Sequence, residues 1–177
     1  SELAIYGMMN SCGGEHAKRE ALALIREELK RQTIFGDELI AYRGVAGEVL
    51  PPDELLANLQ EALDARPDLW QTWSAVALQL MDMNRLEESA DVLDRAVVRF
   101  PMLPKLRFDL AHVRHLQGNA AAAKEGLQNV LEINAGWALA SRRLAYIYEC
   151  EGDLAKSREL LENAVRHSPL DPDNLLK

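Results

Sequence analysis

Two histidines are the strongest candidates for metal chemistry in this sequence. His112 and His115 are three residues apart on one predicted helix, a spacing that can bring two imidazoles onto one metal ion. Asp109 lies one turn earlier, but no third ligand of the usual kind is evident. We therefore interpret the two histidines as polar residues of a groove, and we predict no metal site.

Other candidates for catalysis lack the groups that would complete a site. Cys12 and His16 could act as a nucleophile and a base, but no orienting group or oxyanion site accompanies them. Gly13 and Gly14 are better explained as a turn between helices than as a phosphate loop, because no Lys-Ser/Thr follows and no strand precedes them. The sequence predicts no catalytic residue and no cofactor, so the protein is not expected to be an enzyme.

The composition is that of a folded protein with an acidic surface. Apolar residues make up 48% of the 177 residues and charged residues 27%, and the formal net charge is −8. This charge argues against a nucleic-acid partner, and no apolar run is long enough to insert into a membrane. The first residues show no secretory signal and the two cysteines form no framework, which favours a cytoplasmic location.

The positioning of every candidate side chain follows from a repeat of 34 residues. Four sets of positions recur at this spacing: Pro67, Pro101, Ala135 and Pro169; Asn84, Gly118 and Gly152; Ala77, Ala111 and Ala145; and Leu93, Leu127 and Leu161. A fixed period of this length indicates stacked supersecondary units, each packed mainly on its neighbours.

Each unit reads as two amphipathic helices joined by a short turn. Apolar residues recur at spacings of three and four, the turn residues tolerate a left-handed backbone, and a proline closes two of the three units. The sequence predicts three such units, at about 68–101, 102–135 and 136–169, within a region 67–169. Residues 1–66 are predicted to form degenerate helical hairpins, with helices at about 3–12, 16–31, 36–47 and 52–66. Residues 170–177 are expected to begin a truncated further unit or a tail.

These positions resemble the tetratricopeptide repeat family. The resemblance rests on Trp73, the three alanines, the turn residues, Ala96 and Ala164, and the closing prolines, and it covers about residues 68–169. Ser89 and Ser157 depart from the usual alanine, while Arg107 and Ser141 replace the aromatic residue seen at Trp73. Arg114 replaces a bulky apolar residue and marks a candidate local polar interaction. The resemblance implies an all-α fold, a right-handed α-solenoid of antiparallel helix hairpins.

The resemblance also implies an inner, concave face lined by the first helix of each pair. The residues that it assigns to peptide binding there are Gln71, Leu78, Met81, Lys105, Phe108, His112, His115, Arg142, Arg143 and Tyr146. Apolar members would anchor a peptide, and the cations Lys105, Arg142 and Arg143 would hold a carboxylate. The alternative is that the same residues pack against a further terminal helix.

The function predicted from these features is a non-enzymatic protein–protein interaction scaffold that binds a peptide or a partner domain. A regulatory or substrate-presenting arm of a larger enzyme is a second hypothesis. Self-assembly into a homo-oligomer through exposed end faces is a third.

Overall fold

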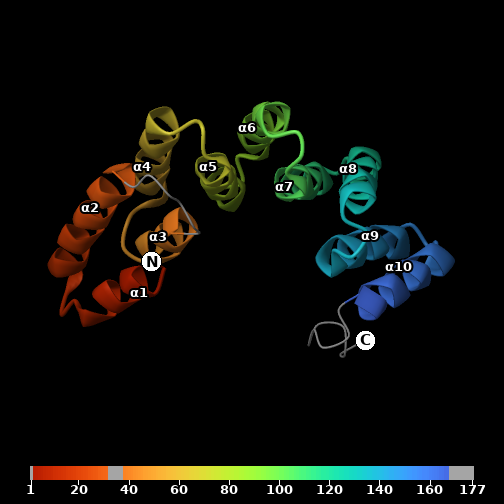
Figure 1. The fold of residues 1–177 in the computed structure, drawn as a ribbon, viewed down its shortest axis with the longest axis horizontal. Coiled ribbons are helices and arrows are strands. Elements are labelled where there is room, and N and C mark those ends of the chain that lie inside the picture. Colours follow the sequence, from red (N-terminus) through yellow and green to blue (C-terminus); the bar gives the residue numbers. More distant parts are fainter. Residues whose placement is uncertain (1, 32–37, 168–177) are drawn as a thin grey trace. The chain divides into compact units, whose positions relative to one another are not determined.

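The computed structural model describes residues 2–31 and 38–167, and every regular element in these ranges is an α-helix (Figure 1). The predictions for residues 168–177, and for the first two residues of the helix expected at 36–47, lie outside the described residues. The helices are α1 (Glu2–Ser11), α2 (Glu15–Arg31), α3 (Glu38–Gly47), α4 (Pro52–Ala65), α5 (Trp70–Asp82), α6 (Leu86–Arg99), α7 (Pro104–Leu116), α8 (Ala120–Ile133), α9 (Ala138–Cys150) and α10 (Leu154–His167). The all-α class predicted from the sequence is confirmed.

The chain divides into two compact units, Ser1–Val92 and Leu93–Lys177, called unit 1 and unit 2 below. The division falls within α6, whereas the repeat places a boundary near residue 67. The repeat boundaries therefore remain a prediction about the sequence pattern, and each unit is described by itself.

In unit 1, α3 is the central helix. It packs against α1, α2, α4 and α5, and α4 packs in turn against α5. Tyr42 and Ala46 of α3 are almost fully buried, although Gly44 and Gly47 weaken the intrinsic helix propensity of this segment. Tertiary packing thus stabilises a helix that its own sequence specifies poorly.

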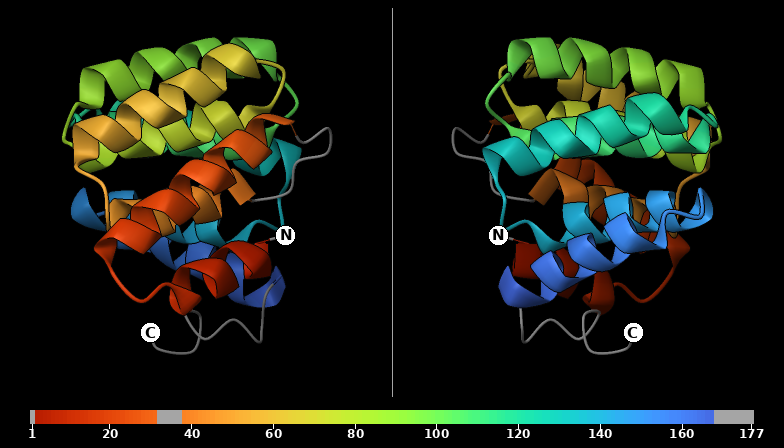
Figure 2. Two further views of the ribbon diagram at one scale, coloured as in Figure 1. Left: turned by 90° about the vertical axis from the view of Figure 1, so that its left-hand side faces the viewer. Right: turned by 90° about the vertical axis from the view of Figure 1, so that its right-hand side faces the viewer.

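In unit 2, consecutive helices pack on one another. Contacts join α7 to α8, α8 to α9 and α9 to α10. The right-hand view of Figure 2 shows α8, α9 and α10 in cyan to blue. Buried apolar side chains from α7, α8 and α9 form one core cluster: Phe108, Ala111, Ala123, Leu127, Val130, Ala140, Leu144 and Ile147. This cluster holds α7 and α9 in place, and both helices carry predicted site residues.

The turns confirm the backbone conformation expected from the repeat. Asn84, Gly118 and Gly152 have φ of 57°, 80° and 84°, in the left-handed region that favours glycine and tolerates asparagine. The residue after each one donates its N–H to a carbonyl five residues earlier, as in Asn119 N to Arg114 O at 2.9 Å. This bond satisfies a carbonyl that the ending helix would otherwise leave open.

Small residues let the helices of a hairpin approach closely, as predicted. Ala77, Ala111 and Ala145 are each at most 2% exposed. At the α7–α8 contact, a Cβ built on Gly126 would lie 3.0 Å from the Cβ of Ala111. Gly126 has no side chain to separate the two helices at this point, and its role was not predicted from the sequence.

The departures from the repeat pattern have structural explanations. The Trp73 indole N–H donates to the Pro67 carbonyl at 2.9 Å, and one period later the Arg107 guanidinium donates to the Pro101 carbonyl at 3.2 Å. Ser89 is fully buried and donates its hydroxyl to the Ala77 carbonyl at 2.8 Å.

Arg114 makes the local polar interaction expected for it. Its guanidinium binds Asp94 at 2.6 Å and the side-chain oxygen of Gln117 at 3.1 Å. A charged residue therefore replaces a bulky apolar one at this position without being left unpaired.

Candidate partner-binding site

Five predicted site residues of unit 2 lie on two helices, α7 and α9. Lys105, His112 and His115 come from α7, and Arg143 and Tyr146 come from α9. We call this set the α7–α9 face. Pro104 begins α7 at a position where its missing N–H removes no helical hydrogen bond.

Lys105 is engaged within its own helix. Its ammonium donates to both carboxylate oxygens of Asp109 at 2.6 Å, and the Asp109 side chain is buried. A buried carboxylate needs a paired cation, so Lys105 serves this role first. Its charge is therefore largely balanced before any ligand arrives.

Arg143 is the cation of the face that has no partner of its own. It makes no hydrogen bond or ion pair with another described residue, and its positive charge acts on His112 of α7. Burial, and then the positive charges of Arg143, His115 and Lys105, lower the pKa of His112 from 6.5 to about 4. His112 is consequently neutral near pH 7, and the surrounding potential is positive.

His115 and Tyr146 form the neighbouring part of the face. Their rings meet edge to face with centroids 6.0 Å apart, and a hydrogen bond with Cys150 raises the pKa of Tyr146. Nδ1 of His115 is buried without a hydrogen-bond partner among the described residues. Tyr146 is 49% exposed, so an aromatic surface remains open beside the free guanidinium.

Other predicted members are placed differently. Phe108 is 5% exposed and stacks against Trp137, with centroids 5.1 Å apart, so its ring belongs to the core cluster and is not available to a ligand. Arg142 is half-buried next to Arg143 and has an interaction of its own. The sequence pattern predicted Phe108 as a peptide-binding residue, but it could not show that the ring packs against Trp137 in the core cluster.

The remaining predicted residues lie on α5 in unit 1. Gln71 is buried, and Leu78 and Met81 are half-buried. Arg43 of α3 donates to the Leu78 carbonyl at 3.4 Å and pairs with Asp82, which occupies part of this side of α5. Burial leaves Gln71 little surface for a ligand, whereas Leu78 and Met81 each keep some.

The described part of the chain also bears on metal sites, disulfides and membrane spans. No group of three histidine, cysteine or acidic side chains is arranged there to hold a metal ion. Cys12 and Cys150 are both free thiols. No helix in the described ranges is long and apolar enough to cross a membrane.

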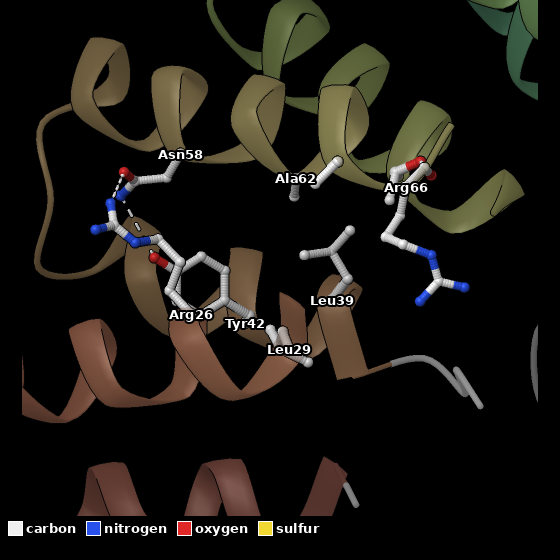
Figure 3. A pocket seen from close by; sticks show the side chains of 9 residues that line it. Arg26, Leu29, Leu39, Tyr42, Asn58, Ala62 and Arg66 are labelled. Atoms are coloured by element: carbon white, nitrogen blue, oxygen red, sulfur yellow. Dashed lines mark hydrogen bonds between the residues drawn. The ribbon is translucent and has the colours of Figure 1, made fainter. Parts of the chain in front are cut away.

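A small, partly open cavity in unit 1 lies among α2, α3, α4 and α5 (Figure 3). Its volume is about 20 Å³, enough for one water molecule but not for an organic ligand. Arg26 donates to the Asn58 oxygen, and the Asn58 amide donates to the Tyr42 hydroxyl at 3.4 Å. Burial raises the pKa of Tyr42, which is thus a neutral part of the packing.

The sequence matches no family model and no curated protein. Solved structures share its fold at low identity. TTC0263, described as a thermophilic TPR protein in Thermus thermophilus, is 18% identical, with 99% of this chain and 96% of that chain covered and a TM-score of 0.74. YrrB, described as a TPR protein with an unusual peptide-binding site, is 18% identical over 96% and 86% of the two chains, with a TM-score of 0.65.

MamA gives a third comparison. One crystal structure is 14% identical, covers 91% of this chain and 92% of that chain, and has a TM-score of 0.68. Because the identities are low, these similarities concern the fold. Together with the 34-residue period, the left-handed turns and the helix pairs, they show that the chain has the tetratricopeptide-repeat fold, an α-solenoid of antiparallel helix hairpins.

Proposed function

We propose that this protein is a non-enzymatic interaction scaffold that binds an acidic segment of a partner protein on its α7–α9 face. The observation that carries the proposal is Arg143, a cation with no hydrogen bond or ion pair to another described residue. Burial first, and then the positive charges of Arg143 and its neighbours, lower the pKa of His112, so positive charge gathers at this face. On a protein with a net charge of −8, such a local excess of positive charge favours a carboxylate ligand.

The adjacent groups suit a peptide. The exposed Tyr146 ring offers an aromatic surface beside Arg143. Arg143 can hold a carboxylate through two parallel hydrogen bonds, which orients as well as attracts it. The fold is consistent with this use, since the similar YrrB is described as having a peptide-binding site.

The test uses a fluorescent eight-residue peptide in which two leucines are flanked by glutamates. We expect the parent chain to bind it, and we expect Arg143→Glu to weaken binding at least about tenfold, since an attractive charge pair becomes repulsive. Tyr146→Ala should weaken binding without changing its salt dependence.

Arg158→Glu is the matched control. Arg158 is exposed on α10 and lies outside the α7–α9 face, and this substitution changes the net charge by the same amount. Equal losses with Arg143→Glu and Arg158→Glu would mean that only overall charge matters, and they would refute the proposed site. Circular dichroism of each variant shows whether its helices are retained.

A further inference from the structure

A second surface of unit 2 lies where α8, α9 and α10 meet. Here a groove of about 570 Å³ is lined by Gln128, Leu131, Glu132, Leu144, Tyr148, Lys156, Glu159 and Leu160. None of these residues belongs to the α7–α9 face. The right-hand view of Figure 2 looks onto α8 and α10, which flank the groove. The groove is shallow and open to solvent, so it suits side chains laid along a surface rather than an enclosed ligand.

The floor of the groove contains apolar side chains. Leu131 and Leu160 are half-buried, and the ammonium groups of Lys124 and Lys156 lie 5.2 and 5.0 Å from the centroid of the Tyr148 ring. Gln128 donates to the Tyr148 hydroxyl at 3.2 Å. The half-buried Tyr148 ring adds aromatic contact area to the floor of the groove.

The cations around the groove are neutralised within the protein. Lys124 donates to both carboxylate oxygens of Glu151 at 2.7 and 2.6 Å, and Lys156 pairs with Asp153 at 2.9 Å. The hydrogen bond from Lys156 lowers the pKa of Asp153, so this carboxylate stays charged and keeps its partner.

Two acidic side chains of the groove have no such partner. Glu132 of α8 and Glu159 of α10 are exposed, and neither makes a hydrogen bond or an ion pair with another described residue. The unbalanced charge at the groove is therefore negative, opposite in sign to that of the α7–α9 face.

The repeat explains why this groove has an uncharged floor. One period earlier the corresponding positions hold Asp94 and Arg114, which form an ion pair at 2.6 Å. At the groove they are Gln128 and Tyr148, which form a neutral hydrogen bond. The same backbone site thus presents an aromatic ring in place of a charge pair, and the ring adds apolar contact area to the groove.

We infer that the α8–α10 groove is a second interaction surface, one that takes a partner segment with apolar side chains flanked by lysine or arginine. The apolar side chains would lie on Leu131, Tyr148 and Leu160, and the flanking cations would meet Glu132 and Glu159. Complementarity of charge selects this occupant over an acidic one. The inference does not rest on the proposed function, because it involves other residues and the opposite charge.

The test uses the charge-inverted probe, a fluorescent eight-residue peptide in which two leucines are flanked by lysines. The parent chain should bind it, and the double variant Glu132→Lys/Glu159→Lys should bind it at least about tenfold more weakly. The matched control is Glu125→Lys/Glu162→Lys, on the same two helices, with exposed residues that do not line the groove. Both variants change the net charge equally, so the control should lose at most about twofold.

Mapping the bound peptide by amide chemical shifts in the parent chain gives a second measurement that requires no variant to fold. Shifts clustered on α8–α10 support the inference. Shifts centred elsewhere, equal losses in the two double variants, or no binding by the parent chain would each overturn it. Binding of the glutamate peptide at the α7–α9 face is measured separately, so either surface can fail without the other.

Discussion

At the α7–α8 contact, we predict that the effect of Gly126→Ala on the free energy of unfolding changes sign when Ala111 is also replaced. Gly126 lies in the middle of α8, and a Cβ there would be 3.0 Å from the Cβ of Ala111, against an optimum of about 3.5–4.0 Å between carbon atoms. Overpacking of this kind typically costs ~1–3 kcal/mol, whereas replacing glycine by alanine in a helix gains ~1 kcal/mol. Gly126→Ala should therefore destabilise the protein by about 1 kcal/mol.

The same substitution should stabilise a chain that already carries Ala111→Gly. The next nearest atoms to the new Cβ are the Ala111 Cα at 3.7 Å and the Arg107 carbonyl oxygen at 3.9 Å, both ordinary contacts. Only the propensity gain of ~1 kcal/mol then remains, and the coupling free energy between the two sites should be about 2 kcal/mol.

The free energy of unfolding is measured by urea unfolding with circular dichroism for the parent chain, the two single variants and the double variant. An unchanged dependence of this free energy on urea concentration shows that all four unfold by the same reaction. Gly7→Ala is the reference for a helical glycine in open space, because nothing lies within 4 Å of its Cβ position, and it should gain stability. If Gly126→Ala is as stabilising as Gly7→Ala, the helices move apart freely and the close approach does not constrain the hairpin.

Three further predictions concern the turns, the buried serine and the histidine. Gly118→Ala should lower the free energy of unfolding, measured with urea, by ~1–2 kcal/mol, because φ at this residue is 80°. No atom lies within 4 Å of the new Cβ, so the whole loss comes from the backbone conformation. Ser89→Ala should cost no more than about 1 kcal/mol by the same assay, since only its bond to a helical carbonyl is lost. The folded pKa of His112, about 4, lies below its ordinary 6.5, so the unfolded chain binds the extra proton first and stability should fall as pH drops from 6.5 towards 4. His112→Gln should flatten this part of a stability–pH profile, and an unchanged profile would contradict the assignment.

The sequence predicted local structure well where a backbone conformation can be adopted by only a few residue types. Asn84, Gly118 and Gly152 were predictable as turns, because few other residues adopt a left-handed conformation at low cost, and the structure confirms all three. Helix positions followed from apolar spacing, even in the weakly helical segment that became α3. Gly126 was not predictable, since a glycine within a helical pattern does not reveal which partner approaches it.

The candidate site was predictable only as a side of a helix. Periodicity assigned all the candidate residues of α5, α7 and α9 to one side of each helix. It could not show which of these side chains are exposed, because exposure depends on neighbours from other elements. Trp137 covers Phe108, and Asp109 engages Lys105. The α8–α10 groove was missed altogether, because its charge balance depends on pairs between helices, which spacing along one helix does not reveal.

The carbonyl groups that precede each first helix show what the repeat requires and what it leaves open. The Pro67 carbonyl accepts from the Trp73 indole, and the Pro101 carbonyl accepts from the Arg107 guanidinium. One period later the Ala135 carbonyl accepts from the side-chain amide of Asn163, at 3.2 Å.

The backbone needs a donor at each of these points, but three unrelated side chains supply it, and the third comes from the second helix of its pair. A carbonyl group accepts a hydrogen bond from any suitably placed N–H, so side-chain identity can vary where the backbone geometry cannot. The same freedom converts the Asp94–Arg114 ion pair into the Gln128–Tyr148 hydrogen bond. Differences between successive repeats, rather than their shared positions, are therefore where a repeat fold of this kind can acquire distinct surfaces.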